Sequence, residues 1–227
     1  MPTRLPASER KAQILRTATE LFSQQGYEGT KTSLIAREAG VNEAIIFRHF
    51  TSKEELYWAV LEASCCANDL NVQLKDSLDF TREPEEVLYQ LAVDILTRIA
   101  ASPHMMRLLL FAALENHKLS HRFFRQYASI KYEELASYIR TRIRQGDFRS
   151  DVDPLLAARA FLGMLIYHNQ IQQLFGGKQV HDYEIKHVAE NFVRLWLGGV
   201  RPETSSERTV PTEPKTRRAK PSLAAAM

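Results

Sequence analysis

The stretch Thr32-Ser-Leu-Ile-Ala-Arg-Glu-Ala-Gly-Val-Asn-Glu-Ala-Ile-Ile-Phe-Arg-His-Phe50 decides the fold at the N-terminal end of this chain of 227 residues. Its small and apolar residues fall where two short helices that cross at a tight turn need them. Ala36 is small enough for the helices to approach closely, and Gly40 supplies the positive φ that such a turn demands. Val41 and Ile46 are the apolar contacts expected between the helices. The pattern predicts a helix-turn-helix.

Short polar residues stand at both expected helix starts, where a side-chain oxygen can accept a hydrogen bond from an unpaired backbone N–H. Thr32 or Ser33 is predicted to cap the first helix, and Asn42 the second. The second helix, from about Glu43 to His49, is then the one that enters a DNA major groove and presents its N-terminal residues to base edges. A purely structural corner between two helices would show the same spacing.

The residues after the turn narrow this choice. The segment from Lys31 to Leu56 closely resembles the TetR/AcrR family of transcriptional regulators, through Ala36, Ala39-Gly40-Val41, Phe47-Arg48-His49-Phe50 and Ser52-Lys53-Glu54. Two positions depart from the family pattern, which often has glycine at Ala44 and usually tyrosine at Phe47. The second departure removes a hydroxyl that can contact DNA in relatives, which leaves packing and van der Waals contact to Phe47.

Glycine and proline separate helical patterns along the whole chain, and no stretch shows sustained alternation of apolar and polar residues. We therefore expect an all-α fold. Residues 1–52 are expected to form a three-helix DNA-binding domain, residues 53–200 a larger helical effector-binding and dimerisation domain, and residues 201–227 a disordered tail. Long uninterrupted helices are predicted over about 8–25, 52–78, 120–145 and 183–197, and further helices begin at Pro84, Pro103 and Pro154.

The net charge of +3 is not a signal for nucleic acid, because the excess lies in the tail. Residues 1–60 carry 8 basic and 7 acidic groups, residues 61–200 carry 16 and 17, and residues 201–227 carry 6 and 3. Placement is more informative, since Lys31, Arg37, Arg48, His49 and Lys53 cluster around the turn and can contact phosphates. There is no secretion signal and no run of about 18 apolar residues, so a cytoplasmic protein without a membrane partner is expected.

The resemblance implies roles for the residues around the turn. Base contacts are expected from Asn42, Glu43, Ala44, Ile45 and Arg48, and Arg48 is the best candidate for a guanine contact. Phosphate contacts are expected from Thr32, His49 and Lys53, and Ser33 and Phe47 complete the predicted DNA-binding set.

The resemblance also implies an effector site in the larger domain, for a small apolar or amphipathic molecule. Aromatic and sulfur-containing residues are frequent there and commonly line apolar pockets, although each one singly is more often part of a core. The candidates are Trp58, Met105, Met106, Phe111, Phe123, Phe124, Tyr127, Tyr167 and His168.

The last two predicted helices are more apolar than one small core requires, which suggests that they pair with the same two helices of a second chain. The resemblance favours this homodimer over a large monomeric core. Leu162, Leu165, Phe192 and Trp196 are the predicted interface residues.

Motifs of other chemistry are weak. His117 and His121 have the spacing of two metal ligands on one helix, but Ser120 between them has the character of a helix cap, so we expect no metal. A disulfide between the adjacent Cys65 and Cys66 is not expected, and one of the pair is expected to pack as a small apolar residue. A redox-sensing role is the alternative. No catalytic motif and no cofactor fingerprint is present, so we expect neither an enzyme nor a cofactor. The resemblance implies a repressor that leaves a palindromic operator when its effector binds. The alternatives are an architectural DNA-binding protein without an effector and an enzyme on a helical scaffold.

Overall fold

The computed structural model describes residues 6–67, 74–115 and 118–202, and within these ranges the chain has helices and no strand, which confirms the all-α prediction. The first part comprises α1 (Ala7–Gly29), α2 (Thr32–Glu38), α3 (Glu43–His49) and α4 (Lys53–Ala67). The second part comprises the 3₁₀ turn η1 (Leu74–Ser77), α5 (Pro84–Ala100), α6 (Pro103–Leu114), α7 (Lys118–Phe123), the π-helical turn η2 (Phe124–Ala128), α8 (Ser129–Gln145), α9 (Pro154–Leu174), α10 (Gly177–Val180) and α11 (Ile185–Val200).

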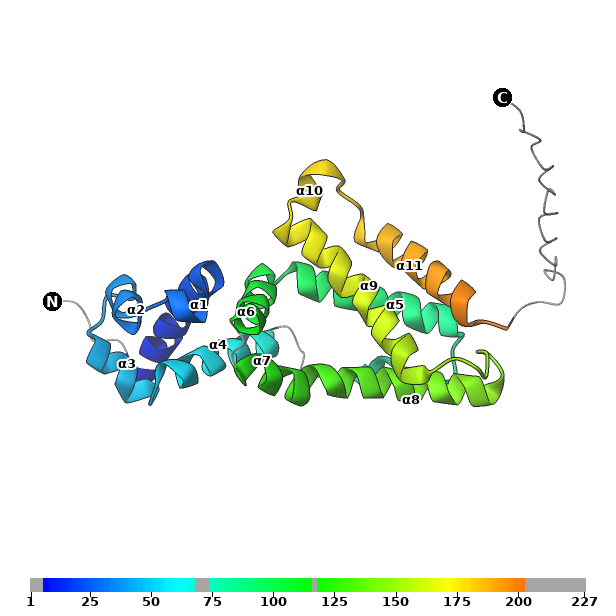
Figure 1. Ribbon diagram of the computed structural model, residues 1–227, viewed down its shortest axis with the longest axis horizontal. Helices are drawn as coiled ribbons and strands as arrows, with labels where there is room; N and C mark the ends of the chain where they lie inside the picture. The colour runs from blue at the N-terminus through cyan, green and yellow to red at the C-terminus, as the bar shows by residue number, and fades with distance from the viewer. Residues whose placement is uncertain (1–5, 68–73, 116–117, 203–227) are drawn as a thin grey trace, which may run out of the picture.

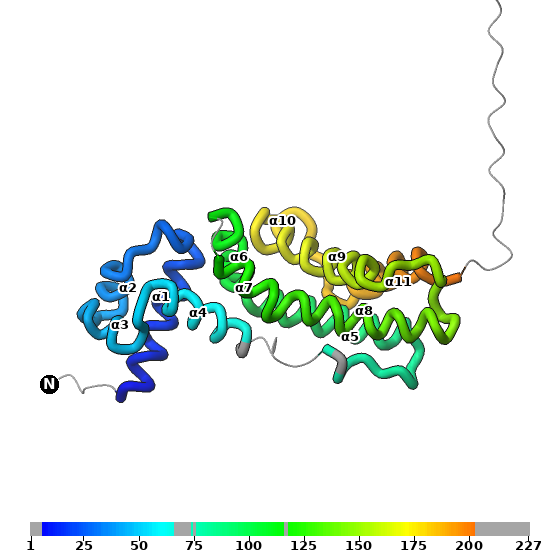
Figure 2. The backbone as a smooth tube through the Cα atoms, turned by 60° about the horizontal axis from the view of Figure 1, so that its bottom comes forward, coloured from blue at the N-terminus to red at the C-terminus, as the bar shows by residue number. Residues whose placement is uncertain are grey.

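The molecule is elongated, with α1–α4 at one end and the bundle of α5, α8, α9 and α11 toward the other (Figure 1). The same order is visible in Figure 2, where α6 and α7 stand next to the small N-terminal unit. Helix α1 packs against both α4 and α6, and α6 also contacts α9. Helix α6 therefore contacts both parts of the molecule.

Two hydrophobic cores correspond to the two ends of the molecule. The N-terminal core joins α1–α4 and includes Ile14, Phe22, Ile46 and Tyr57, together with Leu108 of α6. The C-terminal core joins α5, α8, α9 and α11. The domain boundary predicted after residue 52 stays a prediction, but packing groups α4 with the first three helices.

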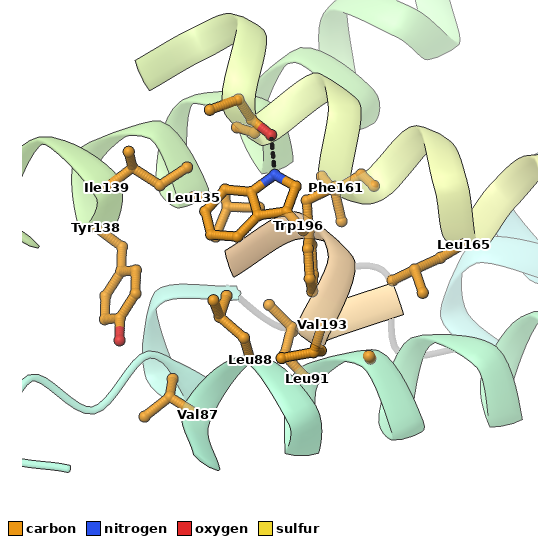
Figure 3. Close-up of a cluster of buried hydrophobic side chains, with 14 of the residues drawn as sticks. Val87, Leu88, Leu91, Leu135, Tyr138, Ile139, Phe161, Leu165, Val193 and Trp196 are labelled. Carbon is orange, nitrogen blue, oxygen red and sulfur yellow. Dashed lines mark hydrogen bonds between the residues drawn. The ribbon is translucent and has the colours of Figure 1, made fainter. Parts of the chain in front are cut away.

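Trp196 of α11 is at the centre of the C-terminal core, among Leu88, Leu135 and Phe161 (Figure 3). Its indole N–H donates a hydrogen bond to the carbonyl oxygen of Ala157 at 3.0 Å. The rings of Phe148 and Phe161 meet it edge-on, with centroids 5.6 and 5.5 Å away. The only polar atom of the Trp196 side chain thus has its hydrogen-bond partner inside the subunit.

Local signals in the sequence fix several helix ends. Pro84 and Pro154 stand in the first turns of α5 and α9, where a missing N–H costs nothing. The carboxylate of Asp153 accepts hydrogen bonds from the N–H groups of Leu155 and Leu156, both at 2.9 Å. Gly146 ends α8 in a left-handed conformation, with a φ of 87°.

Three of the long helices predicted from sequence differ in the structure. The predicted helix over 52–78 is helical to Ala67, residues 68–73 lie outside the described ranges, and Leu74–Ser77 is a 3₁₀ turn. The predicted helix over 120–145 contains the π-helical turn η2. Helix α11 continues through Gly198 and Gly199, which were expected to end it. None of the described helices is long and apolar enough to cross a membrane.

Candidate functional site

The turn between α2 and α3 has the predicted geometry. Gly40 has a φ of 62°, and the N–H of Val41 donates to the carbonyl oxygen of Ala36 at 2.9 Å. Ala36 and Ile46 are buried between the helices, as the pattern required. The side-chain amide of Gln13 on α1 donates to the carbonyl oxygen of Ala39 at 3.0 Å, so α1 holds the turn from behind.

We predict that Gly40→Val lowers the stability of the N-terminal unit by about 1–2 kcal/mol, because the left-handed conformation is unfavourable for a residue with a β-carbon. A β-carbon at this position would meet nothing within 4 Å, so no clash of the β-carbon adds to the backbone strain. Denaturant unfolding measures the change. Gly40→Asn is the control and should cost less, since asparagine tolerates this conformation. Equal stability of the valine variant and wild type would contradict the assignment.

The caps of the two helices were predicted only in part. Asn42 caps α3 as expected, since its side-chain oxygen accepts from the N–H of Ala44 at 2.9 Å. The predicted cap of α2 by Thr32 or Ser33 is wrong, because Lys31 occupies the N-cap position and no side chain caps the helix. The hydroxyl of Thr32 instead donates to the carboxylate of Glu43 at 2.5 Å, which ties the start of α2 to the start of α3.

The predicted DNA-binding residues gather on one unit with different degrees of exposure. Ser33, Asn42, Ala44, Phe47 and Arg48 are exposed, whereas Thr32, Glu43, Ile45, His49 and Lys53 are half-buried. Ile45 packs partly against the N-terminal core. Among the described residues, Arg48 has no hydrogen bond or ion pair with another side chain. Its guanidinium is therefore available to an external acceptor.

Two lysines of this unit lie over aromatic rings. The ammonium of Lys53 is 4.3 Å from the centroid of the Tyr27 ring, and the ammonium of Lys11 is 5.5 Å from that of Phe50. Lys11 was absent from the predicted set, because it is far from the turn in sequence. Its place at the C-terminal end of α3 makes it a further candidate for phosphate contact.

The junction between α1 and α6 is built from hydrogen bonds to one end of α1. The Arg107 Nε–H donates to the carbonyl oxygen of Ser23 at 2.7 Å, and the Ser23 hydroxyl and His104 Nδ1 are hydrogen-bonded at 3.0 Å. The Glu115 carboxylate accepts from the backbone N–H groups of Tyr27 and Glu28 at 3.0 and 3.3 Å. These contacts hold α6 against the helix that supports the turn.

Gly26 makes the close approach of Glu115 possible. Its φ of 74° and ψ of −179° interrupt α1. A β-carbon at this position would lie 2.3 Å from a Glu115 carboxylate oxygen and 2.9 Å from the Phe111 ring. Phe111, predicted to contact an effector, packs at this junction instead.

Helix α4 is connected to the larger part by three further contacts. The Tyr57 hydroxyl donates to the carbonyl oxygen of Leu108 at 2.6 Å, and burial, followed by the nearby Glu115 charge, raises the pKa of this phenol. The Lys118 ammonium pairs with Glu54 at 2.8 Å. The Arg122 guanidinium lies 3.7 Å from the centroid of the Trp58 ring. Because its pKa is raised, the Tyr57 phenol stays protonated and can donate its hydrogen bond throughout the physiological pH range.

A cavity of about 200 Å³ lies on the side of α6 that faces the bundle. Four predicted effector residues line it: Met105, Met106, Phe123 and Tyr127. The others do not. Trp58 is buried in the N-terminal core, but its ring is 6.4 Å from that of Tyr127. Tyr167 and His168 line a separate surface hollow, Phe111 lies at the junction, and Phe124 is 48% exposed.

The face of α5 that forms much of the cavity wall was not predicted, because its residues are neither aromatic nor sulfur-containing. Leu91, Ile95 and Ile99 supply apolar surface from α5, and Asp94 and Arg98 supply charge. Two of the lining residues, Tyr127 and Ala128, belong to the π-helical turn η2. Such turns occur often at functional sites.

The charged groups of the wall differ in their partners. Asp94 accepts a hydrogen bond from the Gln90 amide at 2.8 Å. Lys131 pairs with Glu134 at 3.2 Å. Arg98 is half-buried and has no hydrogen bond or ion pair to any residue in the described part of the chain. Its side chain lines the cavity, and its guanidinium has no counterion among the described residues.

The predicted interface residues lie mostly inside the subunit, which corrects that prediction. Leu165 and Trp196 are buried in the C-terminal core, and Leu162 is buried beside the cavity. Phe192 is half-buried, with its ring 5.6 Å from that of His168. Burial lowers the pKa of that histidine. The large hydrophobic residues that remain exposed on the same two helices are Leu156, Tyr167 and Leu195, with exposed fractions of 63%, 62% and 67%.

In the described ranges no group of three or more potential metal ligands lies together. His121 is exposed, and His117 lies outside the described residues. Cys65 is buried, in line with a packing role.

Two sequence profiles match the chain. Residues 14–60 match the profile described as bacterial regulatory proteins of the tetR family. Residues 86–199 match the profile described as the C-terminal domain of AefR-like transcriptional repressors. The first match covers α2, α3, most of α1 and the first half of α4. The second covers the helical bundle and most of the residues that line the cavity. The two profiles together span both parts of the fold.

Individual relatives agree with the profiles. The transcriptional activator FasR of Mycolicibacterium smegmatis is 46% identical over 59 residues, which cover 26% of this chain and 27% of FasR. The transcriptional regulator AcrR of Shigella flexneri is 34% identical over 97 residues, which cover 41% and 43%. The matched residues thus span less than half of the length of each of these two relatives. The crystal structure of PfmR from Thermus thermophilus, 25% identical, matches with a TM-score of 0.60 over 82% of this chain and 97% of that one.

Proposed function

Because the chain belongs to the TetR family of bacterial regulatory proteins, we propose that it is a ligand-responsive repressor that binds a palindromic operator as a homodimer. One observation carries this proposal. Helix α6 lines an apolar cavity with Met105, Met106 and Leu109, and it hydrogen-bonds to the helix-turn-helix unit through His104 and Arg107. An architectural DNA-binding protein would need no such cavity. We propose no enzymatic activity, and we place the protein in the cytoplasm, where a bacterial operator lies.

Operator reading is assigned to the exposed face of α3 and its first turn. Arg48 is the residue with the right chemistry for a guanine contact, since its free guanidinium can donate to both acceptors on the major-groove edge. Ala44 and Phe47 offer apolar surface to a thymine methyl group. The Glu43 carboxylate, already held by Thr32, can accept from a cytosine amino group. Lys11 and Lys53 are assigned to phosphates.

We predict that Arg48→Ala leaves the fold intact and weakens binding to the operator by about 1–3 kcal/mol, the usual worth of a bidentate base contact. The operator for this test is a duplex enriched by the protein from random-sequence DNA. Fluorescence anisotropy measures binding to this duplex and to unselected DNA. Arg140→Ala removes an exposed arginine of α8 and is the matched control. An equal loss on both DNAs would show that Arg48 only holds phosphate.

The homodimer is assigned to the exposed faces of α9 and α11, where Leu156, Tyr167 and Leu195 are uncovered. Gly198 and Gly199 are also exposed on α11 and allow a second copy to approach its backbone. Two helices from each chain would form a four-helix bundle around a two-fold axis. This axis would place the two α3 helices on half-sites about 34 Å apart or a multiple of that distance.

The response to a ligand is assigned to the walls that the cavity shares with the DNA-binding part. An occupant that contacts Met105 and Met106 acts on α6, and one that contacts Tyr127 acts through Trp58 on α4. The proposal requires that α4 and α6 adopt one arrangement when the protein binds the operator and another when it does not. The ligand lowers operator affinity only if it binds the second arrangement more tightly than the first. A thermal-shift screen of lipophilic compounds finds ligands. Compounds that raise the melting temperature should also release the operator, and stabilisation without release would favour the architectural alternative.

A further inference from the structure

We propose that the effector is an anionic amphipath, with a short hydrocarbon body in the cavity and a single carboxylate or similar anionic head group bound by Arg98. This inference rests on the proposed function, since it names the ligand class of the same cavity. The proposal rests on two features of the cavity. Its wall is mostly apolar, and Arg98 in this wall has no counterion among the described residues.

The apolar part of the ligand follows from the wall. Leucine, isoleucine and methionine side chains from α5, α6 and α9 surround the space, together with the rings of Phe123 and Tyr127. The volume of about 200 Å³ is below the range of roughly 300–1,000 Å³ for sites of drug-sized ligands. A short alkyl chain or a small ring system fits this space better than a large multicyclic compound. Methionines allow the wall to adjust to the ligand's shape.

The charge of the head group follows from the partners of the three charged residues in the wall. Lys131 is compensated by Glu134, and the carboxylate of Asp94 accepts from the Gln90 amide. Arg98 stands four residues after Asp94 on α5, yet the two form no ion pair. Arg98 is half-buried beside apolar side chains and has no protein acceptor in the described part of the chain, so an anion bound in the cavity would supply the missing partner. The planar guanidinium also matches a carboxylate in two parallel hydrogen bonds.

A cationic ligand is the opposing possibility, because Asp94 also lines the cavity. Its carboxylate already has the Gln90 amide as a donor, whereas Arg98 has no acceptor in the described part of the chain. A cation would add a second positive charge near Arg98 and Lys131. The balance of charges in the wall therefore favours an anion.

Three probes of one chain length test the proposal: octanoate, 1-octanol and octylamine, which are anionic, neutral and cationic at neutral pH. Isothermal titration calorimetry on the full chain measures their binding. We expect octanoate to bind about tenfold more tightly than octanol, the worth of one charge-assisted hydrogen-bonded pair at a half-buried site. Octylamine should bind most weakly. Arg98→Gln should remove the preference for octanoate and leave octanol binding unchanged.

Two matched variants complete the test. Arg140→Gln removes an exposed arginine outside the cavity and should retain the preference. Asp94→Asn should not weaken octanoate binding. Tighter binding of octanol or octylamine, octanoate binding that survives Arg98→Gln, or no binding of any probe would overturn the anionic class. The proposed function would fail differently, through absence of operator binding by the ligand-free protein, which is measured separately on the same preparation.

Discussion

A protein with Leu195→Glu is expected to sediment as a monomer and to bind its operator at least about a hundredfold more weakly than wild type, because an unpaired charge buried at an interface costs several kcal/mol. Leu195 is 67% exposed on α11, so the charge is harmless in the isolated subunit and harmful only where a second copy covers it. A single α3 helix contacts too few base pairs for strong binding, and the loss of the dimer removes the second half-site. Analytical ultracentrifugation and fluorescence anisotropy measure the two effects.

Leu114→Glu is the matched control, since this leucine is 83% exposed on α6 and lies outside the proposed interface. It should leave both the dimer and the affinity unchanged. A Leu195→Glu protein that stays dimeric with full affinity would move the dimer surface elsewhere. The same change at Trp196 would not test the interface, because this side chain is enclosed in the C-terminal core and its loss would unfold the subunit (Figure 3).

Gly26→Ala is expected to destabilise the N-terminal unit by about 3 kcal/mol or more, from backbone strain and overpacking together. The φ and ψ of Gly26 lie in a region that is essentially restricted to glycine. The new methyl group would also displace the Glu115 carboxylate from the N–H groups of Tyr27 and Glu28. Thermal unfolding measures the loss of stability, and the variant should also bind operator weakly, because α1 supports the turn.

Two variants separate the causes. Gly29→Ala lies in the same helix, where a β-carbon would make only an ordinary contact with Gln25, and it should not destabilise. Gly26→Ala combined with Glu115→Ala relieves the clash with the carboxylate but not the strain, so it should be less unstable than the sum of the single changes. A Gly26→Ala protein as stable as wild type would contradict the junction described here.

The helix-turn-helix could be predicted from sequence because its determinants are local. Three residue types have the same structural role in most folds: glycine in a left-handed turn, a small residue where helices cross, and asparagine before a helix. Gly40, Ala36 and Asn42 have these roles in the structure. The cap by Thr32 or Ser33 failed for a non-local reason. Glu43 of the next helix takes the hydroxyl of Thr32, and no pattern within α2 records that contact.

The larger part could be predicted only as a set of helices. An apolar stripe shows that a face is covered, but not whether the same subunit or a second one covers it. For this reason Leu165 and Trp196 were assigned to an interface although they are buried inside the subunit, and the exposed Leu156 and Leu195 were not among the predicted residues. The π-helical turn at Phe124–Ala128 contains neither glycine nor proline and left no signal.

The cavity shows the same limit. Met105, Met106, Phe123 and Tyr127 were predicted from residue type and do line it. Arg98 was missed because its lack of a partner is a property of the folded chain. A charged residue on a helix is normally solvated, and this one lies beside an apolar space only because residues of α5, α6, α8 and α9 line the same cavity.

Selection of double-stranded DNA by the purified protein from a random-sequence library tests most directly whether a symmetric dimer reads DNA through α3. We expect enrichment of an inverted repeat whose half-site centres are about 34 Å, or a multiple of it, apart along the duplex. Arg48→Ala should relax the preference for guanine at one position in each half-site. Recovery of DNA with no common sequence, or of a single site without a repeat, would contradict this expectation.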